Sequence, residues 1–229
     1  VEVWSDTLSL LIWQEPKPLD ILEKYTAHTG RMPKLPEWAL GTILGLQGGD
    51  KKVMNAPREA IKAGNPVSAV WIQDWVGRRP TKYGDRLWWN WIPDTIRYGN
   101  MKEFTGDLAE MNIKTLGYIN SFMVPGTAMT DTAIARGYLV KTQTGEPYLM
   151  PAGGFDAYLV DLSNPAAFEW LKDIIKTNLI GNGFSGWMAD FCEWLPWDAK
   201  IHSGEAAPAF HNRYPVEWAR LNREAIKEA

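Results

Sequence analysis

Cysteine is almost absent from this sequence: Cys192 is the only one in 229 residues. A single cysteine excludes a disulfide within the chain and is typical of a reducing compartment, so we expect a cytoplasmic location. Basic residues are scattered without a Lys/Arg-rich tract, and the formal net charge is -3. Nucleic acid is therefore not an expected partner, because binding a phosphate backbone requires clustered cations.

Long hydrophobic runs are missing as well. No segment approaches the roughly 20 apolar residues of a membrane-spanning helix, so we expect no membrane partner. Residues 1–6 show no basic leader and no cleavage-site pattern, and no export signal is expected. His28, His202 and His211 lack the spacing of metal ligands, so neither a metal nor a cofactor is expected.

Tryptophan, in contrast, is abundant, with 13 residues. A buried indole N–H needs a hydrogen-bond partner, so this many tryptophans are not all expected in the core. Most lie in two groups: Trp71, Trp75, Trp88, Trp89 and Trp91, then Trp187, Trp194 and Trp197. Sugar rings stack their C–H faces on aromatic side chains, so the groups indicate either a sugar-binding cleft or packing under loops.

Strand and helix patterns alternate along the chain. Apolar runs predict strands at residues 40–46, 67–75, 115–119 and 186–190. Amphipathic or capped stretches predict helices at residues 50–63, 101–111, 165–179 and 216–229. This order indicates parallel strands joined by crossover helices, so the predicted fold class is α/β.

Polar side chains follow the predicted strands where their carboxyl ends meet, which is where barrel enzymes hold their active sites. They are Gln47, Gln73, Asp74, Asn120 and Asp190. Four strand–helix units make half of a (β/α)8 TIM barrel, which typically needs about 250 residues. We therefore expect an incomplete catalytic barrel at residues 37–229. An approach segment at residues 1–36 would comprise the end of a β-rich region and a short helix.

Asp190 is the most informative single residue. It ends the apolar run Gly-Trp-Met-Ala-Asp at residues 186–190 and precedes a loop rich in aromatics and proline. An aspartate is seldom buried unless it is paired or used, which favours a catalytic carboxylate. The alternative is an aspartate that caps the turn after the strand.

Two segments resemble glycoside hydrolase family 31, the α-glucosidase-like retaining enzymes. Residues 25–41, YTAHTGRMPKLPEWALG, look like the approach to that family's catalytic barrel. Residues 186–191, GWMADF, resemble its nucleophile strand, specifically in the sulfoquinovosidase branch. Enzymes of that branch hydrolyse α-glycosides of sulfoquinovose, a glucose with a sulfonate in place of its 6-hydroxyl. The resemblance covers the chain from about residue 19 onward and implies a hydrolase of O-glycosyl bonds.

Four residues match the set by which that branch holds the sulfonate: Gln47, Gln73, Arg86 and Trp89. A fifth member of the set, a tyrosine, is expected past residue 229. A sulfonate is a permanent anion with acceptor oxygens only, which suits a guanidinium, an indole N–H and amide donors. Arg86 and Trp89 are three residues apart, and we expect one helical turn to aim both the same way.

The resemblance makes Asp190 the nucleophile. A retaining enzyme needs a second carboxyl group about 5–5.5 Å away, and the resemblance places this acid/base past residue 229. The isolated 229-residue chain is therefore not expected to complete the reaction. Asp74 looks like the acceptor of a ring hydroxyl, although pairing with Arg78 or Arg79 is an alternative.

Three further expectations concern the surroundings of Asp190. Trp187, together with Trp75, is expected to form the floor of the sugar pocket, and Glu193 is expected to support the site. Cys192 stands where the branch has glycine, and its Cβ would disturb the turn if the backbone needs positive φ. Two alternative functions stay open: an α-glucosidase or α-xylosidase without sulfonate selectivity, and a non-catalytic carbohydrate-binding barrel fragment.

Overall fold

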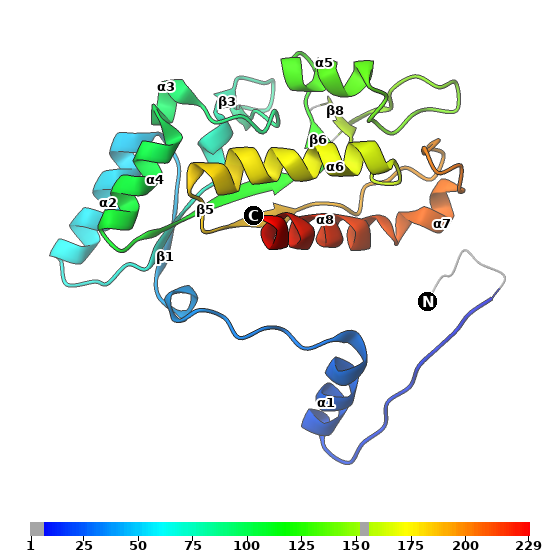
Figure 1. Cartoon of the computed structure of the whole chain (residues 1–229), viewed down its shortest axis with the longest axis horizontal. Coiled ribbons are helices and arrows are strands. Elements are labelled where there is room, and N and C mark those ends of the chain that lie inside the picture. The colour runs from blue at the N-terminus through cyan, green and yellow to red at the C-terminus, as the bar shows by residue number, and fades with distance from the viewer. Residues whose placement is uncertain (1–6, 152–155) are drawn as a thin grey trace.

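A four-stranded parallel sheet forms the centre of the molecule (Figure 1). The computed structural model describes residues 7–151 and 156–229. The strands, in their order across the sheet, are β1 (Ile43–Leu46), β2 (Ala69–Ile72), β5 (Lys114–Asn120) and β9 (Gly186–Asp190). Every pair of neighbours is parallel. The sheet is therefore an arc of four successive strands of a TIM barrel, which confirms the predicted α/β class and the partial barrel.

A helix follows each strand of the sheet. These helices are α2 (Asp50–Lys62), α4 (Met101–Glu110), α6 (Pro165–Ile174) and α8 (Tyr214–Glu228). Helix α6 continues through a π-helical stretch, Ile175–Leu179, and lies beside α8 (Figure 1). Asn164 caps α6 as the sequence predicts, with its side chain accepting the Ala166 N–H. The N-cap of α2 is Gly49, and Asp50 is the first residue of the helix, where its Oδ1 accepts the Lys51 N–H.

The segments between the barrel units contain short strands and helices. After β2, a 3-10 turn (Gln73–Val76) leads into the hairpin of β3 (Arg78–Arg79) and β4 (Arg86–Leu87), and then into α3 (Thr95–Tyr98). After β5 come β6 (Phe122–Met123), α5 (Ala128–Ala135), β7 (Leu149–Pro151) and β8 (Asp156–Leu159). A 3-10 turn (Ile180–Asn182) precedes β9, and α7 (Ala207–His211) precedes α8.

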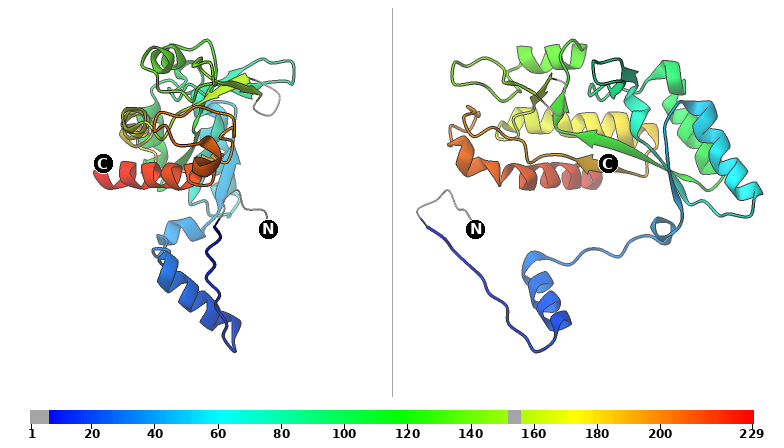
Figure 2. Two further views of the ribbon diagram at one scale, coloured as in Figure 1. Left: turned by 90° about the vertical axis from the view of Figure 1, so that its right-hand side faces the viewer. Right: turned by 180° about the vertical axis from the view of Figure 1, so that it is seen from behind.

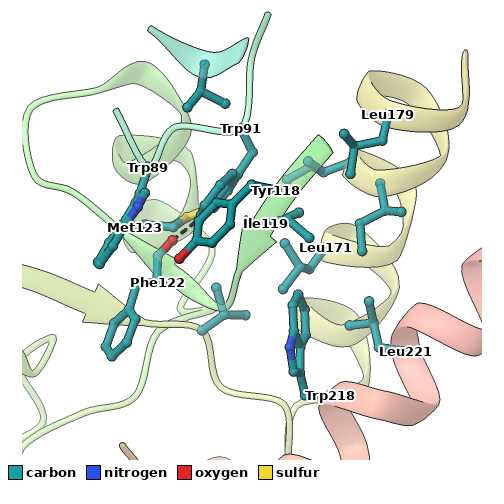
Figure 3. Packing of buried hydrophobic residues seen from close by; sticks show 14 of the residues in the cluster. Trp89, Trp91, Tyr118, Ile119, Phe122, Met123, Leu171, Leu179, Trp218 and Leu221 are labelled. Carbon is teal, nitrogen blue, oxygen red and sulfur yellow. Dashed lines mark hydrogen bonds between the residues drawn. The ribbon is translucent and has the colours of Figure 1, made fainter. Parts of the chain in front are cut away.

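The core lies on both faces of β5. Ile119 points toward Leu171 of α6 and toward Leu221 of α8, while Tyr118 points the other way, toward Trp91 (Figure 3). Gly117 lets the helical layer approach the sheet, because a Cβ there would lie 2.8 Å from Leu179 Cδ2. Side chains of β5 therefore alternate: one set packs against the helix layer, and the other faces the interior of the arc.

The N-terminal arm lies apart from the sheet in all views (Figures 1 and 2). It comprises α1 (Pro18–Thr29), which is capped by Gly30 and buries no side chain, and the 3-10 turn Glu37–Leu40. Residues 7–13, which we expect to end a preceding β-rich region, form no strand in this structure. The rest of this stretch, residues 1–6, lies outside the described residues. Within the described chain, no helix has the length and apolar character needed to cross a bilayer.

Candidate active site

A pocket of about 250 Å³ opens where the strands of the sheet end. Its lining residues are Gln47, Gln73, Arg78, Asp85, Arg86, Leu87, Trp89, Tyr118, Asp190 and Phe191. Eight residues are predicted to bind the sugar or react with it, and five of them line this pocket, although they are spread over more than 140 positions of the sequence. The eight are Gln47, Gln73, Asp74, Arg86, Trp89, Trp187, Asp190 and Glu193. A larger hollow of about 500 Å³ between α2 and α4 contains none of the eight. The chemistry that the sequence predicts is therefore gathered in the smaller pocket.

Gln47 and Gln73 are paired side chain to side chain. In the parallel register Leu46 lies opposite Ile72, so each glutamine occupies the position directly after its strand. The amide nitrogen of Gln47 donates a hydrogen bond to Gln73 Oε1 at 2.7 Å. This bond uses the carbonyl of Gln73 and leaves its N–H groups as donors for a ligand in the pocket.

Asp190 ends β9 directly opposite Asn120 of β5. The hydroxyl of Tyr118 donates a hydrogen bond to Asp190 Oδ2, and the same hydroxyl accepts one from Asn120 Nδ2 at 3.2 Å. Asn120 is fixed in turn, because its Oδ1 accepts the backbone N–H of Phe122. A buried chain of hydrogen bonds thus leads from the backbone to the carboxylate of Asp190.

Burial raises the pKa of the Tyr118 phenol, and the hydrogen bond to Asp190 raises it further, against a lowering by the bond from Asn120. The phenol therefore stays protonated and remains a donor to the carboxylate. Tyr118 was missed by reasoning from the sequence. It precedes Asn120 by two residues, and the period of two in a strand could have placed both side chains on one face.

Arg86 and Trp89 both line the pocket, but the expectation that they share a helical turn is wrong. Arg86 lies in β4, where it pairs with Arg79 across an antiparallel hairpin, so its backbone is extended. The chain then turns at residues 89–90. This turn, rather than helical periodicity, brings the two side chains to the same pocket.

Trp89 belongs to an aromatic wall. It is only 6% exposed, and its ring stacks on Phe122 at 5.5 Å with an interplanar angle of 19°. Phe191, the residue after Asp190, lies against Trp89 at 5.8 Å. The indole nitrogen of Trp89 is buried within this wall.

Arg78 and Asp85 also line the pocket, although no sequence pattern predicts them there. Arg78 Nη2 donates to the backbone carbonyl of Asp85 at 3.1 Å, which braces the hairpin across its two strands. Arg78 and Asp85 lie close in sequence to Arg86 and to the 3-10 turn after β2, and this closeness could have indicated that they share the site. The inference requires the pairing of β3 with β4, which local periodicity does not predict.

Asp74 does not face the pocket, contrary to expectation. Its side chain has no exposed surface. Oδ1 accepts a hydrogen bond from the Tyr98 hydroxyl, and Oδ2 accepts the backbone N–H of Gly48. The role as acceptor of a ring hydroxyl is therefore corrected, and the alternative pairing with Arg78 or Arg79 is not what occupies the carboxylate.

The two tryptophans expected to floor the pocket lie elsewhere. Trp187 is three residues before Asp190 in the same strand, so it points to the opposite face and donates its indole N–H to Asn222 of α8 at 2.7 Å. Trp75 is fully buried and donates to the backbone carbonyl of Tyr118. Trp187 thus joins β9 to α8, and Trp75 joins the turn after β2 to β5, so neither is a wall of the pocket.

Glu193 is exposed and is not among the residues that line the pocket. The turn that carries it is strained: Phe191 has φ 49° and Cys192 has φ 139°. Cys192 therefore adopts the positive φ at which the resemblance expects glycine. Burial raises the pKa of the Cys192 thiol, with nearby Glu193 and Asp190 adding to the effect, so the thiol stays neutral.

Parallel strands with crossover helices and a polar pocket at their carboxyl ends define a domain of the TIM-barrel enzyme class. The family model described as "Glycosyl hydrolases family 31 TIM-barrel domain" matches residues 32–229. The chain belongs to glycoside hydrolase family 31.

Characterised relatives agree with this assignment. The chain is 37% identical over 227 residues to a sulfoquinovosidase of Escherichia coli strain K12, covering 99% of this chain and 34% of that protein. It is 36% identical over 230 residues to a sulfoquinovosidase of Agrobacterium fabrum, with the same two coverages. The chain thus spans about a third of the length of the curated relatives it matches.

A solved structure is similar throughout the barrel arc. It is a family 31 sulfoquinovosidase from E. rectale in complex with the aza-sugar inhibitor IFGSQ, with a TM-score of 0.87 and 40% sequence identity. The similarity covers 92% of this chain and 32% of that one.

Proposed function

We propose that the protein carrying this sequence is a retaining α-glycoside hydrolase that acts on sulfoquinovosides, with Asp190 as its nucleophile. The observation that carries the proposal is the lining of one pocket: Asp190 shares it with Gln47, Gln73, Arg86 and Trp89. The similarity to two sulfoquinovosidases supports the substrate class.

The anionic end of the sugar would be held by donors. A sulfonate offers only acceptor oxygens, and the planar guanidinium of Arg86 can give it two parallel N–H groups. The Gln73 amide adds neutral donors, because its carbonyl is already occupied by Gln47. Trp89 walls this part of the pocket. A plain glucoside has no charge for Arg86 to neutralise, so the pocket favours the sulfonated sugar.

The other end of the sugar would meet Asp190. An ionised carboxylate attacks the anomeric carbon, the glycosidic C–O bond breaks, and a glycosyl-enzyme forms. The hydrogen bond from Tyr118 orients the attacking carboxylate and stabilises its negative charge. The departing oxygen needs a proton from a second carboxyl group about 5–5.5 Å from the first. We propose that this acid/base belongs to a part of the protein that follows residue 229, as does the tyrosine of the sulfonate-binding set.

The proposal also includes the division of the chain into two segments and the location of the protein in the cell. Residues 1–36 serve as the approach segment and residues 37–229 as the barrel arc. Two observations support this division: Pro36 is the N-cap of the 3-10 turn Glu37–Leu40, and α1 buries none of its side chains. The single cysteine of the sequence supports a cytoplasmic location.

The test is hydrolysis by the protein expressed from its complete gene. Rates are measured on 4-nitrophenyl α-sulfoquinovoside and on 4-nitrophenyl α-glucoside, with the wild type and with Asp190→Asn. We expect preference for the sulfonated sugar, and loss of nearly all turnover in Asp190→Asn. Asp198→Asn is the matched control, because Asp198 lies nearby but outside the pocket and accepts a hydrogen bond from Tyr148.

Each part of the proposal can fail separately. Equal or better hydrolysis of the plain glucoside would reject the sulfoquinovoside substrate and favour an α-glucosidase. Full activity of Asp190→Asn would reject the nucleophile. Binding of both sugars without hydrolysis of either would favour a carbohydrate-binding function.

A further inference from the structure

Asp74 directly follows Gln73 of the glutamine pair and is fully buried. Its carboxylate has no exposed surface, yet both oxygens are used. Oδ2 accepts the backbone N–H of Gly48 at 2.9 Å, and Oδ1 accepts the hydroxyl of Tyr98, itself only 2% exposed. Asp74 thus joins the backbone of the turn after β1 to the buried phenol of Tyr98.

The turns that follow β1 and β2 carry Gln47 and Gln73, respectively. Gln47 immediately precedes Gly48, and Gln73 immediately precedes Asp74. The bond between the glutamine side chains in the pocket therefore lies one residue from the bond between Asp74 and Gly48. This bond joins the carboxyl ends of β1 and β2, next to the residues that carry the half-buried glutamine pair.

The turn after β1 depends on two glycines. Gly48 has φ 113° and Gly49 has φ 94°, a backbone region that favours glycine and that other residues rarely adopt. A Cβ on Gly49 would lie 2.9 Å from the carbonyl oxygen of Arg97, so the turn is packed closely against the end of α3. Without the carboxylate, the Gly48 N–H would lose the acceptor that joins it to β2, and the buried Tyr98 hydroxyl would lose its acceptor as well.

We propose that Asp74 is a positioning residue: with Tyr98, it sets the distance and orientation of the Gln47 and Gln73 amides that receive the anionic end of the substrate. This inference rests on the proposed function. Hydrogen bonds weaken steeply when distance or angle departs from the optimum, so a small displacement of the turn weakens contact with the sulfonate. Asp190 is held by β5 and β9 through Tyr118, so bond cleavage itself is not expected to depend on Asp74.

The experiment compares Asp74→Asn and Tyr98→Phe with the wild type, in the protein expressed from its complete gene. The readout is the ratio of kcat/KM on the sulfoquinovoside to kcat/KM on the corresponding glucoside, together with the separate kcat and KM values. Asp74→Asn is expected to lower this ratio by about tenfold or more, through a higher KM for the sulfonated sugar. Tyr98→Phe, which keeps the ring in place, is expected to act in the same direction with a smaller effect.

Asp161→Asn is the matched control. Asp161 is also buried, at 3% exposure, and accepts hydrogen bonds from Ser163 and from the His202 backbone, away from the pocket. It is expected to lower thermal stability and to leave the substrate ratio unchanged. If Asp74→Asn fails to fold, Tyr98→Phe decides the question.

The outcomes separate this inference from the proposed function. A wild type without preference for the sulfonated sugar overturns the proposed function, and this inference with it. If the wild type prefers the sulfonated sugar and the variants keep the full ratio while they lose only stability, the positioning role alone is overturned.

Discussion

The hydroxyl of Tyr118 lies 2.8 Å from Oδ2 of Asp190 and donates a hydrogen bond to it. The two residues are 72 positions apart, and adjacent parallel strands bring them together. A hydrogen bond to a charged group contributes about 1.5–3 kcal/mol, so this contact is strong enough to influence the reactivity of the carboxylate.

Tyr118→Phe is therefore expected to lower kcat by about tenfold to a hundredfold, which is the rate equivalent of that free energy. The ring keeps its packing, so KM for the sulfoquinovoside is expected to change little. The check is steady-state kinetics with a thermal melt. An unchanged kcat would show that the hydroxyl only stabilises the fold by satisfying Asn120.

Arg86→Ala is expected to abolish the preference for the sulfonated sugar over the plain glucoside. A charge-assisted bidentate contact is lost, and the effect on kcat/KM for the sulfoquinovoside is expected to be about a hundredfold. The matched control is Lys82→Ala, which removes an exposed cation from the same hairpin but outside the pocket lining. If both variants lowered activity equally, a general field of positive charge would explain the result.

Cys192→Gly is expected to raise the free energy of unfolding by about 1 kcal/mol, because glycine adopts φ 139° without a steric penalty. Cys192→Ala removes the thiol but keeps the Cβ, so it is expected to bring no such gain. Urea denaturation of the three proteins is the measurement. Equal stabilisation by alanine and glycine would assign the effect to the thiol rather than to the backbone.

Stability is expected to fall in alkaline solution. Burial raises the pKa of Tyr98, Tyr118 and Tyr214, so these phenols stay protonated in the native protein. An unfolded tyrosine ionises near pH 10. Above that pH the unfolded state has released protons that the native state retains, and the free energy of unfolding decreases as pH rises.

Urea titrations from about pH 8 to about pH 11 span the ionisation of unfolded tyrosine and test this expectation. Tyr98→Phe is expected to show a shallower decline than the wild type, whereas Tyr83→Phe, at an exposed position, is expected to follow the wild type. Identical slopes in all three proteins would rule out the buried tyrosine as a cause.

The sequence was sufficient for the order of the barrel units and for the position of Asp190 at a strand end. Both follow from local patterns: apolar runs, caps such as Asn164, and glycines after helices. The neighbourhood of Asp190 also follows, because parallel strands place their carboxyl ends together. Gln47, Gln73 and Asp190 could therefore be assigned to one site from the sequence alone.

Other side chains depended on contacts distant in sequence. Asp74 turns inward because Tyr98, 24 residues later, supplies a donor to its carboxylate, and no local pattern indicates such a contact. The hairpin pairing of Arg79 with Arg86 likewise replaces the helical turn that spacing favoured. Trp187 is different: strand alternation already separates it from Asp190, so the period of two could have prevented that error.

The hairpin of β3 and β4 lies between β2 and β5 in the sequence and brings Arg86 to the pocket, whereas Asp190 lies on β9. Under the proposed function, a residue that receives the sulfonate and the nucleophile thus lie in separate stretches of the chain. Exchange of residues 78–89 between members of this family, together with Gln47 and Gln73, is therefore expected to change the sugar preference while it leaves the nucleophile strand untouched.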